Sequence, residues 1–238
     1  MNDASALSPV AIRLGQIRQE IGAAAAAAGR DPAGITLVAV SKTHAPERIL
    51  EAVAAGQRRF GENRVQEAQA KWPMIKARHH DIGLHLIGPL QTNKIRQAVA
   101  LFDVIESVDR DSLAARLRPE MEKAGRQLAC YVEINSGAEP QKAGIAPGEA
   151  DSFIERCRTE HGLAIAGLMC VPPLGTDPAP HFALLRTIAE RHGIAHLSMG
   201  MSEDFPIAIA EGATELRIGT AIFGSRETAP AAKLGRET

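Results

Sequence analysis

Eight short apolar runs alternate with helical patterns along the 238 residues of the chain, and this alternation limits the possible folds more than any other feature. Strands that alternate with helices form parallel sheets with right-handed crossovers. Eight such units in a chain of this length favour a closed barrel over an open, doubly wound sheet. The predicted strands are 35–41, 58–62, 85–88, 102–107, 127–135, 163–171, 195–199 and 215–218.

Helical patterns follow the first seven strands, and one further helix precedes the first strand. The expected helices are 8–29, 46–55, 63–72, 91–100, 109–125, 147–159, 179–192 and 204–210. Ser8 and Asp109 stand where N-caps of two of these helices are expected. The apolar stripe of the first helix is predicted to consist of Ile12, Ile17 and Ile21, with Leu14 nearby.

The predicted fold class is therefore α/β, a single (β/α)8 TIM barrel with an extra N-terminal helix. Neither G-x-G-x-x-G nor a P-loop occurs, which removes the usual marks of an open nucleotide-binding sheet. No composition shift or linker marks a second domain, so one domain is expected over residues 1–238. Its core is expected at about 8–226, with 227–238 as a tail.

Composition narrows the class of protein further. The formal net charge is −1 with both signs interspersed, so no nucleic-acid-binding surface is indicated. The N-terminus lacks a signal pattern, and no apolar stretch is long enough to cross a bilayer. The three cysteines have no C-x-x-C spacing, and Cys130 and Cys170 fall in apolar runs typical of buried positions. A cytoplasmic protein without nucleic-acid or membrane partners is expected.

Lys42 follows the apolar run 37–40, at the end of the first predicted strand. In a (β/α)8 barrel, the residues directly after the strands line the active face. A lysine at this place is either a solvated strand-end residue or a functional amine, and this stretch alone favours the solvated interpretation.

The loops after the seventh and eighth strands carry a second signal. Barrels often bind phosphate at these loops, with the N-terminus of a short helix beside them. Glycines at 200 and 219 would let the backbone approach a ligand, and Ser202 and Thr220 supply hydroxyl donors. The alternative is that the glycines form tight turns and Ser202 is a plain N-cap.

Arg217 lies inside the eighth apolar run, where a guanidinium is costly unless it is paired. One interpretation is a salt bridge that closes the barrel, with Glu215 or Glu62 as partner. The other is a permanently charged donor that faces a ligand. The histidines show no ligand spacing such as H-E-x-x-H, so no metal site is predicted.

A lysine after the first strand, a phosphate cup after the last two, and an arginine in the eighth form one constellation. Such a site suits an aldehyde that bears a phosphate and is held by the lysine amine as a Schiff base. One reading of this site alone is a cofactor-free lyase that acts on a phosphosugar.

Five longer motifs occur in register along the chain. They are residues 40–43 (VSKT), 60–67 (FGENRVQE), 85–94 (HLIGPLQTNK), 199–204 (MGMSED) and 217–224 (RIGTAIFG). Together they closely resemble the pyridoxal phosphate homeostasis protein family, over about residues 10 to 226. Small departures occur at Leu86, where the family more often has Phe, and at Arg64, where Tyr is common.

The resemblance implies a fold, a cofactor and the residues that hold it. The family is similar to the N-terminal barrel of bacterial alanine racemases and lacks their second domain, which makes a monomer the expected state. Lys42 would carry pyridoxal 5′-phosphate as a Schiff base, and Arg217 would face the pyridine nitrogen. The remaining contacts implied are Asn63 beside the cofactor and Ser202, Gly219 and Thr220 at its phosphate.

The family's role is to bind and buffer the cofactor in vitamin B6 homeostasis and to pass it transiently to apo-enzymes, without strong turnover. Two residues agree with that role. An arginine cannot protonate the pyridine nitrogen, because guanidinium stays charged in proteins. The one tyrosine, Tyr131, is expected near the start of the fifth strand, away from the active rim, so a second acid or base is missing. The alternative function is a weak amino-acid racemase that uses the same cofactor.

Overall fold

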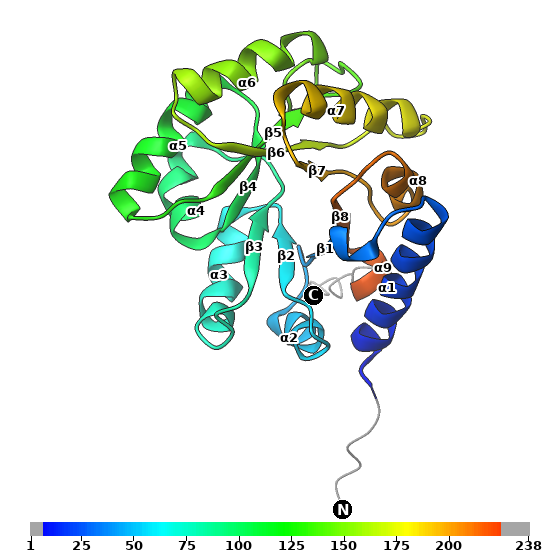
Figure 1. Cartoon of the computed structure of the whole chain (residues 1–238). Helices are drawn as coiled ribbons and strands as arrows, with labels where there is room; N and C mark the ends of the chain where they lie inside the picture. The colour runs from blue at the N-terminus through cyan, green and yellow to red at the C-terminus, as the bar shows by residue number, and fades with distance from the viewer. Residues whose placement is uncertain (1–6, 225–238) are drawn as a thin grey trace, which may run out of the picture.

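A closed barrel of eight parallel strands forms the centre of the molecule (Figure 1). The computed structural model describes residues 7–224. The order of the strands in the barrel is their order in the chain, so the predicted (β/α)8 topology is confirmed. The strands are β1 (Thr36–Val40), β2 (Arg59–Glu62), β3 (Gly83–Leu86), β4 (Val104–Val108), β5 (Ala129–Ile134), β6 (Ile165–Cys170), β7 (His196–Ser198) and β8 (Glu215–Ile218).

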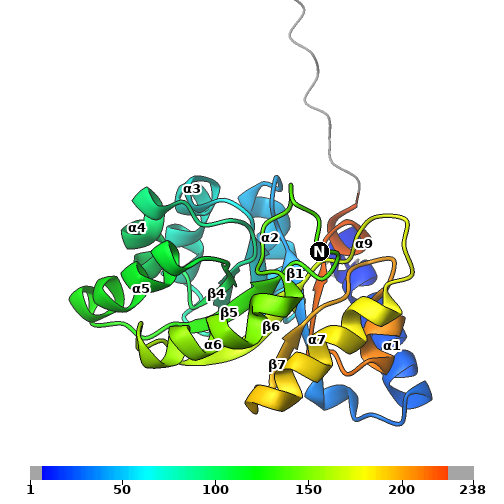
Figure 2. The ribbon, with the colours of Figure 1, turned by 90° about the horizontal axis from the view of Figure 1, so that it is seen from above.

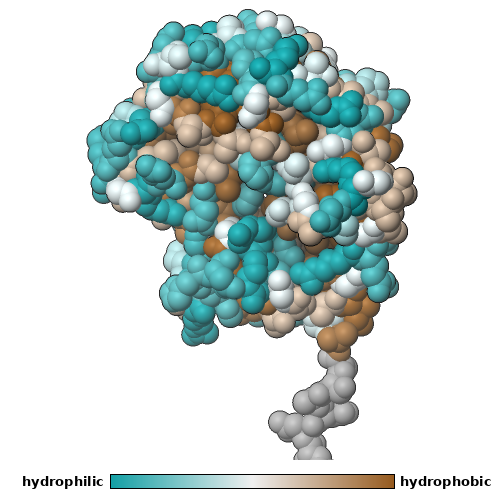
Figure 3. Space-filling view, viewed as in Figure 1, coloured by the Kyte–Doolittle hydropathy of each residue, from teal (hydrophilic) through white to brown (hydrophobic). Residues whose placement is uncertain are grey.

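Helices surround the barrel, and Figure 2 shows α6 and α7 lying over β5, β6 and β7. The α-helices are α1 (Pro9–Ala27), α2 (Pro46–Ala54), α3 (Val65–Lys76), α4 (Ile95–Leu101), α5 (Asp111–Ala124), α6 (Ala150–Thr159), α7 (Ala179–His192), α8 (Phe205–Ala210) and α9 (Thr220–Phe223). Single 3-10 turns add η1 (Pro32–Gly34), η2 (Thr92–Lys94) and η3 (Pro147–Glu149). Hydrophilic residues cover much of the rim in Figure 3, and apolar residues gather toward its upper middle.

The extra helix α1 closes the barrel at the seam between its first and last strands. It packs against α2, α8 and α9, and Figure 1 shows it alongside α8 and α9. Ser8 caps it as predicted, because its Oγ accepts a hydrogen bond from the N–H of Ala11 at 3.2 Å. Its buried face consists of Val10, Leu14, Ile17, Ile21 and Ala25.

The predicted stripe of α1 was wrong at one residue. Ile12 is 49% exposed, whereas Leu14 is fully buried. Two residues along a helix turn the side chain by about 200°, so a face that contains Leu14 cannot also contain Ile12.

Several predicted helix starts are also corrected. Asp109 is not an N-cap: α5 begins at Asp111 after Arg110, no side chain caps it, and the Asp109 carboxylate pairs with the Arg110 guanidinium. The third helix begins at Val65, two residues later than expected, because Arg64 is still extended at φ −133° and ψ 129°. The predicted helix 91–100 begins with the 3-10 turn η2. Helix α9 was not predicted at all.

Polar side chains occupy much of the barrel interior. Alternation along the strands sends Ala39 outward into the apolar layer under the helices, and Val38 and Val40 inward. Across the interior from these two valines, the ring of Tyr131 lies against Gly167. A Cβ at position 167 would lie 2.7 Å from the tyrosine ring, so any larger residue would block the space that the ring fills. The other buried polar residues of the interior are His85, Glu106, Ser198, Glu215 and Arg217.

The three cysteines are free and buried. Burial raises the pKa of each thiol to about 12, so none is a thiolate at neutral pH. The expectation of buried Cys130 and Cys170 is confirmed.

None of the helices between residues 7 and 224 combines the length and apolar character that a bilayer crossing requires. The predicted tail, 227–238, lies outside the described residues.

Candidate functional site

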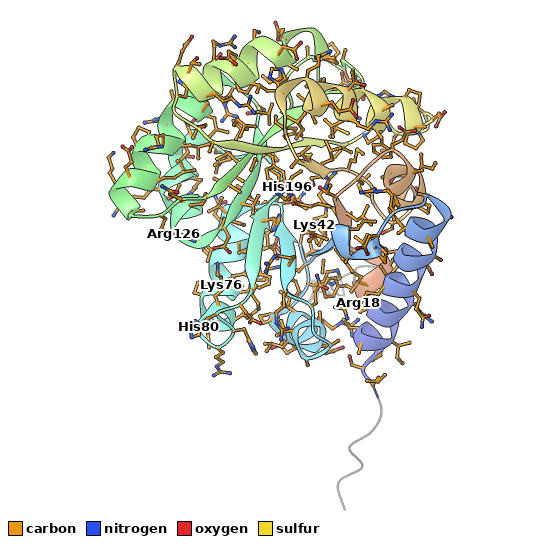
Figure 4. All side chains as sticks on the ribbon, in the orientation of Figure 1. Arg18, Lys42, Lys76, His80, Arg126 and His196 are labelled. Carbon is orange, nitrogen blue, oxygen red and sulfur yellow. The ribbon has the colours of Figure 1, made fainter. Side chains whose placement is uncertain are left out.

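Lys42 lies at the mouth of the barrel, two residues past the end of β1. Because Val38 and Val40 face the interior, the alternation of the strand directs Lys42 toward the same side. Its side chain is half-buried. Figure 4 places Lys42 near the centre of the ring, whereas Lys76 and Arg126 lie among the peripheral elements. His196 also projects near the centre, but it begins β7 and therefore belongs to the opposite end of the barrel.

Asn63 lies beside Lys42 on the next strand. The register of β1 with β2 pairs Val40 with Gly61, which carries Lys42 alongside Asn63. The Oδ1 atom of Asn63 is buried and accepts no hydrogen bond from the described residues. A Cβ at Gly88, after β3, would lie 2.4 Å from the carbonyl oxygen of Asn63, so glycine is required for this close approach.

Gly219 and Thr220 lie on the other side of Lys42. The register of β1 with β8 pairs Ala39 with Ile218, so Gly219 reaches the level of Val40. A Cβ at position 219 would lie 3.2 Å from both Cβ and the carbonyl oxygen of Val40. Thr220 begins α9, and the N–H groups of Thr220 and Ala221 donate no hydrogen bond within the described chain. A short helix that the sequence did not predict therefore follows the eighth strand.

Ser202 lies in the loop after β7, in which Gly200 has a φ of +93°. This loop is joined to β8, since the N–H of Arg217 donates to the carbonyl of Gly200 at 3.0 Å. The N-cap of α8 is Asp204, whose carboxylate accepts from the N–H of Met201 at 2.6 Å. The interpretation of Ser202 as an N-cap is therefore wrong.

Arg217 projects from β8 into the interior and is 5% exposed. Its Nη1 donates to Ser198 Oγ at 2.6 Å, and its Nη2 donates to the carbonyl of Cys170 at 2.8 Å. The carboxylate nearest to it is Glu106, at 4.0 Å.

The expected salt bridge of Arg217 with Glu215 or Glu62 is not formed. Glu215 is two residues away on the same face of β8 and lies one layer deeper. Glu62 faces outward, toward α3.

A hydrogen-bonded chain supports Arg217 from below. Ser198 links Arg217 to Glu106, because its hydroxyl donates to Glu106 Oε2 at 2.5 Å. His85 Nδ1 lies 2.7 Å from the other oxygen of Glu106. Burial alone would raise the pKa of Glu106, but the hydrogen bond from His85 and the charges of His85 and Arg217 outweigh it and lower that pKa. Glu106 is therefore the anion that balances the buried guanidinium.

Glu215 and Tyr131 form the deeper layer of the interior. The Tyr131 hydroxyl donates to Glu215 Oε1 at 2.5 Å. Burial and the charge of Glu106 raise the pKa of Glu215. Burial and the charge of Glu215 raise the pKa of the Tyr131 hydroxyl. Tyr131 is thus bound below the mouth of the barrel, and the rim gains no acid or base from it.

The turn that carries Lys42 is held by a charged cluster behind it. The N–H of Thr43 donates to Glu67 Oε1 at 2.5 Å, and Lys71 Nζ lies 2.8 Å from the same oxygen. Lys71, only 7% exposed, also donates to the carbonyl oxygens of Ser41 (2.9 Å) and His44 (3.3 Å). Both sides of the Lys42 turn are therefore fixed to α3.

Glu62 completes this cluster between β2 and α3. It is fully buried, and its Oε1 accepts from Ser41 Oγ at 2.6 Å and Trp72 Nε1 at 3.0 Å, with Lys71 Nζ at 2.9 Å. The predicted strand-end residue Glu62 is therefore part of the support for Lys42, outside the barrel.

Glu133 is a further titratable group near the mouth. It shares the inward face of β5 with Tyr131, closer to the end of the strand. Burial and the charge of Asp109 raise the pKa of Glu133 to about 7, against the opposing charge of Arg217.

Sequence reasoning found the residues at the rim and missed those that support them. The rim residues come from neighbouring strand ends: Lys42 follows β1, Asn63 follows β2, and Gly219 and Thr220 follow β8. Ser202 follows β7, and Arg217 lies within β8. The missed residues are Glu67, Lys71, Glu106, Ser198 and Glu133. Only the isolated carboxylates in the apolar runs, such as Glu106 in residues 102–107, gave a signal that could have indicated an interior network.

Comparison with known proteins places this barrel in a family. The model of the alanine racemase N-terminal domain matches residues 12–227. The pyridoxal phosphate homeostasis protein of Pseudomonas aeruginosa is 41% identical over 228 residues, which cover 93% of this chain and 97% of that protein. The chain belongs to the pyridoxal phosphate homeostasis protein family.

Two further similar proteins extend this result. The pyridoxal phosphate homeostasis protein of Escherichia coli (strain K12) is 39% identical over 235 residues, with 93% of this chain and 98% of that protein covered. The structure of PipY from Synechococcus elongatus PCC7942 with PLP bound has a TM-score of 0.78 at 39% identity, covering 90% of this chain and all of that one. The predicted family and barrel are thus confirmed over nearly the whole chain.

Proposed function

We propose that this protein binds pyridoxal 5′-phosphate (PLP) and holds it as a Schiff base on Lys42, as a carrier in intracellular vitamin B6 homeostasis. The observation that carries the proposal is the placement of Lys42 between Asn63 and the Gly219–Thr220 turn at one end of the barrel. The PLP-bound structure of PipY, a relative with the same fold, supports the choice of cofactor.

Unused hydrogen-bonding groups at the mouth fit this cofactor. Asn63 has a buried oxygen without a partner. Arg217 uses two of its five N–H groups within the described residues, although the side chain is almost completely buried. The first N–H groups of α9 are also unused, and such groups bind phosphate. Buried polar groups that lack partners are rare, which favours a polar ligand here.

Each residue then has a role that its position allows. Ser202, Gly219 and Thr220 hold the phosphate through hydroxyl and backbone donors. Arg217, fixed from below by Ser198, donates to the ring nitrogen. When bound, PLP supplies an aldehyde that condenses with an amine and a ring that withdraws electrons. Lys42 provides that amine, held in place by the turn that Glu67 and Lys71 fix.

The same residues favour a carrier over an enzyme. A guanidinium cannot give a proton to the ring nitrogen, so the ring withdraws electrons less strongly than one paired with a carboxylic acid. The hydroxyl of Tyr131 is hydrogen-bonded to Glu215 in the interior and is not available at the rim. Tyr131 therefore cannot serve as a second acid or base opposite Lys42.

Three further points belong to this proposal. The protein acts in the cytoplasm and as a monomer, and it passes PLP transiently to apo-enzymes that need it. The match of this chain to two pyridoxal phosphate homeostasis proteins over 97–98% of their length supports a role of this kind.

Reduction with borohydride tests the attachment residue. Protein incubated with PLP should absorb as a Schiff base, and borohydride should abolish that absorbance and leave one adduct that mass spectrometry maps to Lys42. Lys42→Ala should give no adduct, and Lys123→Ala, at an exposed lysine of α5, should behave like the wild type. An adduct of equal yield in Lys42→Ala would show that the assignment is wrong.

Exchange with deuterium separates the carrier from a racemase. Loaded protein is incubated with L-alanine or L-serine in deuterated water, and mass spectrometry follows deuterium at Cα. We expect no incorporation above that of free PLP at the same concentration. Incorporation at enzyme-like rates, with D-amino acid formed, would overturn the carrier function and support a racemase.

A further inference from the structure

A cavity opens beside the candidate cofactor site. It has a volume of about 940 Å³ and lies between the start of α3, the segment that joins β3 to η2, and Arg110 ahead of α5. Asn63 lines it and is also the neighbour of Lys42. The cavity therefore adjoins the cofactor site on the side of β2 to β4, opposite the phosphate loops of β7 and β8.

Cations outnumber anions in the lining of this cavity. Four charged groups line it: Arg64, Glu67, Lys94 and Arg110. Arg110 is paired with Asp109, and Glu67 pairs with Lys71 at 2.8 Å, which it shares with Glu62. Arg64 and Lys94 form no ion pair within 4 Å with any described residue, although the charge of Arg64 helps to lower the pKa of Glu67. Arg64 and Lys94 thus place one cation on each wall, and Glu67 offsets part of the charge of Arg64.

Hydrogen-bond donors lie between these two cations. No side chain caps α3, and the N–H groups of Val65, Gln66 and Glu67 donate no hydrogen bond within residues 7–224. The side chains of Gln66 and Gln91 add amide donors. No aromatic residue lines the cavity, so it offers no surface for a stacked base.

We propose that this cavity binds the phosphate group of a small phosphate compound, with Arg64 and Lys94 as the charged contacts. A phosphate group carries negative charge that both cations attract, and arginine, lysine and backbone N–H groups are the usual phosphate donors. The proposal comes from the unpaired cations and the cavity together. The compound is inorganic phosphate or the phosphate ester of a small organic molecule, and the size of the cavity leaves room for the organic part.

Calorimetric titration at constant ionic strength tests this site, with inorganic phosphate and glycerol 3-phosphate as separate probes. Protein with PLP fixed on Lys42 by borohydride is used, so that the cofactor's own phosphate loops are filled. We expect saturable binding with one site per chain, and at least tenfold weaker binding in Arg64→Gln/Lys94→Gln. Tighter binding of glycerol 3-phosphate than of phosphate would identify an ester as the ligand, and equal or weaker binding would identify phosphate itself.

The matched control is Arg96→Gln/Lys123→Gln, which removes two positive charges from exposed positions of α4 and α5. It should bind both probes within twofold of the wild type, and melting curves without phosphate check that both double variants are folded. No saturable binding in the wild type would overturn the proposal. Equal losses in the two double variants would also overturn it, since general charge would then explain the binding.

A failure of the cofactor proposal would be seen separately, as the absence of an adduct on Lys42. In that case the titration is repeated on untreated protein and on Ser202→Ala/Thr220→Ala. If Ser202→Ala/Thr220→Ala still binds phosphate and Arg64→Gln/Lys94→Gln does not, the result supports the cavity. If Ser202→Ala/Thr220→Ala loses binding and Arg64→Gln/Lys94→Gln keeps it, the phosphate binds at the β7 and β8 loops and the inference is overturned.

Discussion

Thr43 adopts a left-handed backbone conformation, with φ +66°, immediately after Lys42. A β-branched residue is rarely found there, because its side chain crowds the backbone. Conformations of this kind persist only where surrounding contacts enforce them, and they are frequent at functional sites. Here the enforcing contact is the hydrogen bond from the Thr43 N–H to Glu67. The direction of the Lys42 side chain therefore depends on a carboxylate in α3.

Glu67→Gln should destabilise the protein by about 1 to 2 kcal/mol, because the nearly buried Lys71 loses one of its two anionic partners. Urea denaturation measures the change. Burial would raise the pKa of Glu67, but the hydrogen bonds from Lys71 and Thr43 outweigh it and lower that pKa, so the carboxylate is charged at neutral pH.

Glu51→Gln is the control for this prediction. Glu51 pairs with Arg48 at the surface of α2, and its side chain has the same exposed fraction as that of Glu67, 29%. That change should cost less than about 0.5 kcal/mol, and equal losses would contradict the role of Glu67.

Glu133→Gln should make stability less dependent on pH. The pKa of Glu133 rises from 4.5 to about 7 on folding, so the folded state binds more protons between these values and wild-type stability falls as pH rises through that window. The loss amounts to about 3 kcal/mol by pH 8, since one pKa unit equals about 1.4 kcal/mol. Urea denaturation at pH 5 and pH 8 should show the variant gaining stability relative to the wild type at the higher pH. Glu155→Gln, on the exposed face of α6, should follow the wild type at both pH values. The same relative change in both variants would exclude Glu133 as the cause.

The loop from β7 to α8 shows how one element depends on a single glycine. Gly200 has a positive φ and lies against α8, so that a Cβ there would be 2.6 Å from the Cβ of Ala208. Arg217, two residues from Gly219 on the adjoining strand, donates its backbone N–H to this same glycine. The loop that carries Ser202 is therefore locked both to its helix and to the strand of the candidate site.

Gly200→Ala should cost about 2 to 4 kcal/mol, because the left-handed conformation and the collision with α8 both oppose it. Gly193→Ala is the matched change, since Gly193 also has a positive φ, at the end of α7, but has no atom within 4 Å of a Cβ. It should cost only about 1 kcal/mol. Urea denaturation of both variants gives the comparison, and similar costs would mean that the contact with α8 contributes little.

Closure of the whole barrel depends on α1, which covers the β8–β1 seam. Leu14→Ala should destabilise the protein by about 2 to 5 kcal/mol, because a fully buried side chain leaves a cavity. Ile12→Ala removes an apolar side chain of similar size from the exposed face of the same helix, and it should change stability by less than about 0.5 kcal/mol. Thermal unfolding of both variants checks this. Equal shifts in the unfolding temperature would show that the seam does not rely on the buried face.

The barrel was predictable because its determinants are local and repeated. Apolar runs and helical patterns alternate eight times, and parallel connections leave few topologies. Helix starts were less accessible: the residues after a strand can stay extended, as Arg64 does, without any change in composition. The helix α9 is only four residues long, too short for a periodic pattern.

The rim of the candidate site was predictable for the same reason. Once the strands are known to be parallel and neighbouring, their C-terminal ends must lie together at one end of the barrel. Its supports were not, because they depend on contacts between distant residues. The partner of Arg217 is Ser198, and through it Glu106, on the far side of the interior. Nothing near Arg217 in sequence indicates this choice, and Glu215, the obvious neighbour, is engaged with Tyr131. Which inward residues meet is set by the stagger of the closed barrel.

The pairing of β1 with β8 has a consequence for the order in which the protein is made. Lys42 emerges from the ribosome early, whereas Gly219 and Thr220, its neighbours across that pairing, lie near the end of the residues that the structure describes. Synthesis proceeds from the N-terminus, and a barrel has no closed sheet before its final strand. A nascent chain therefore exposes the lysine for most of its synthesis without the loops beside it. Only a chain that has been synthesised as far as α9 can bring these residues together, so the lysine and its neighbours form one site late in synthesis.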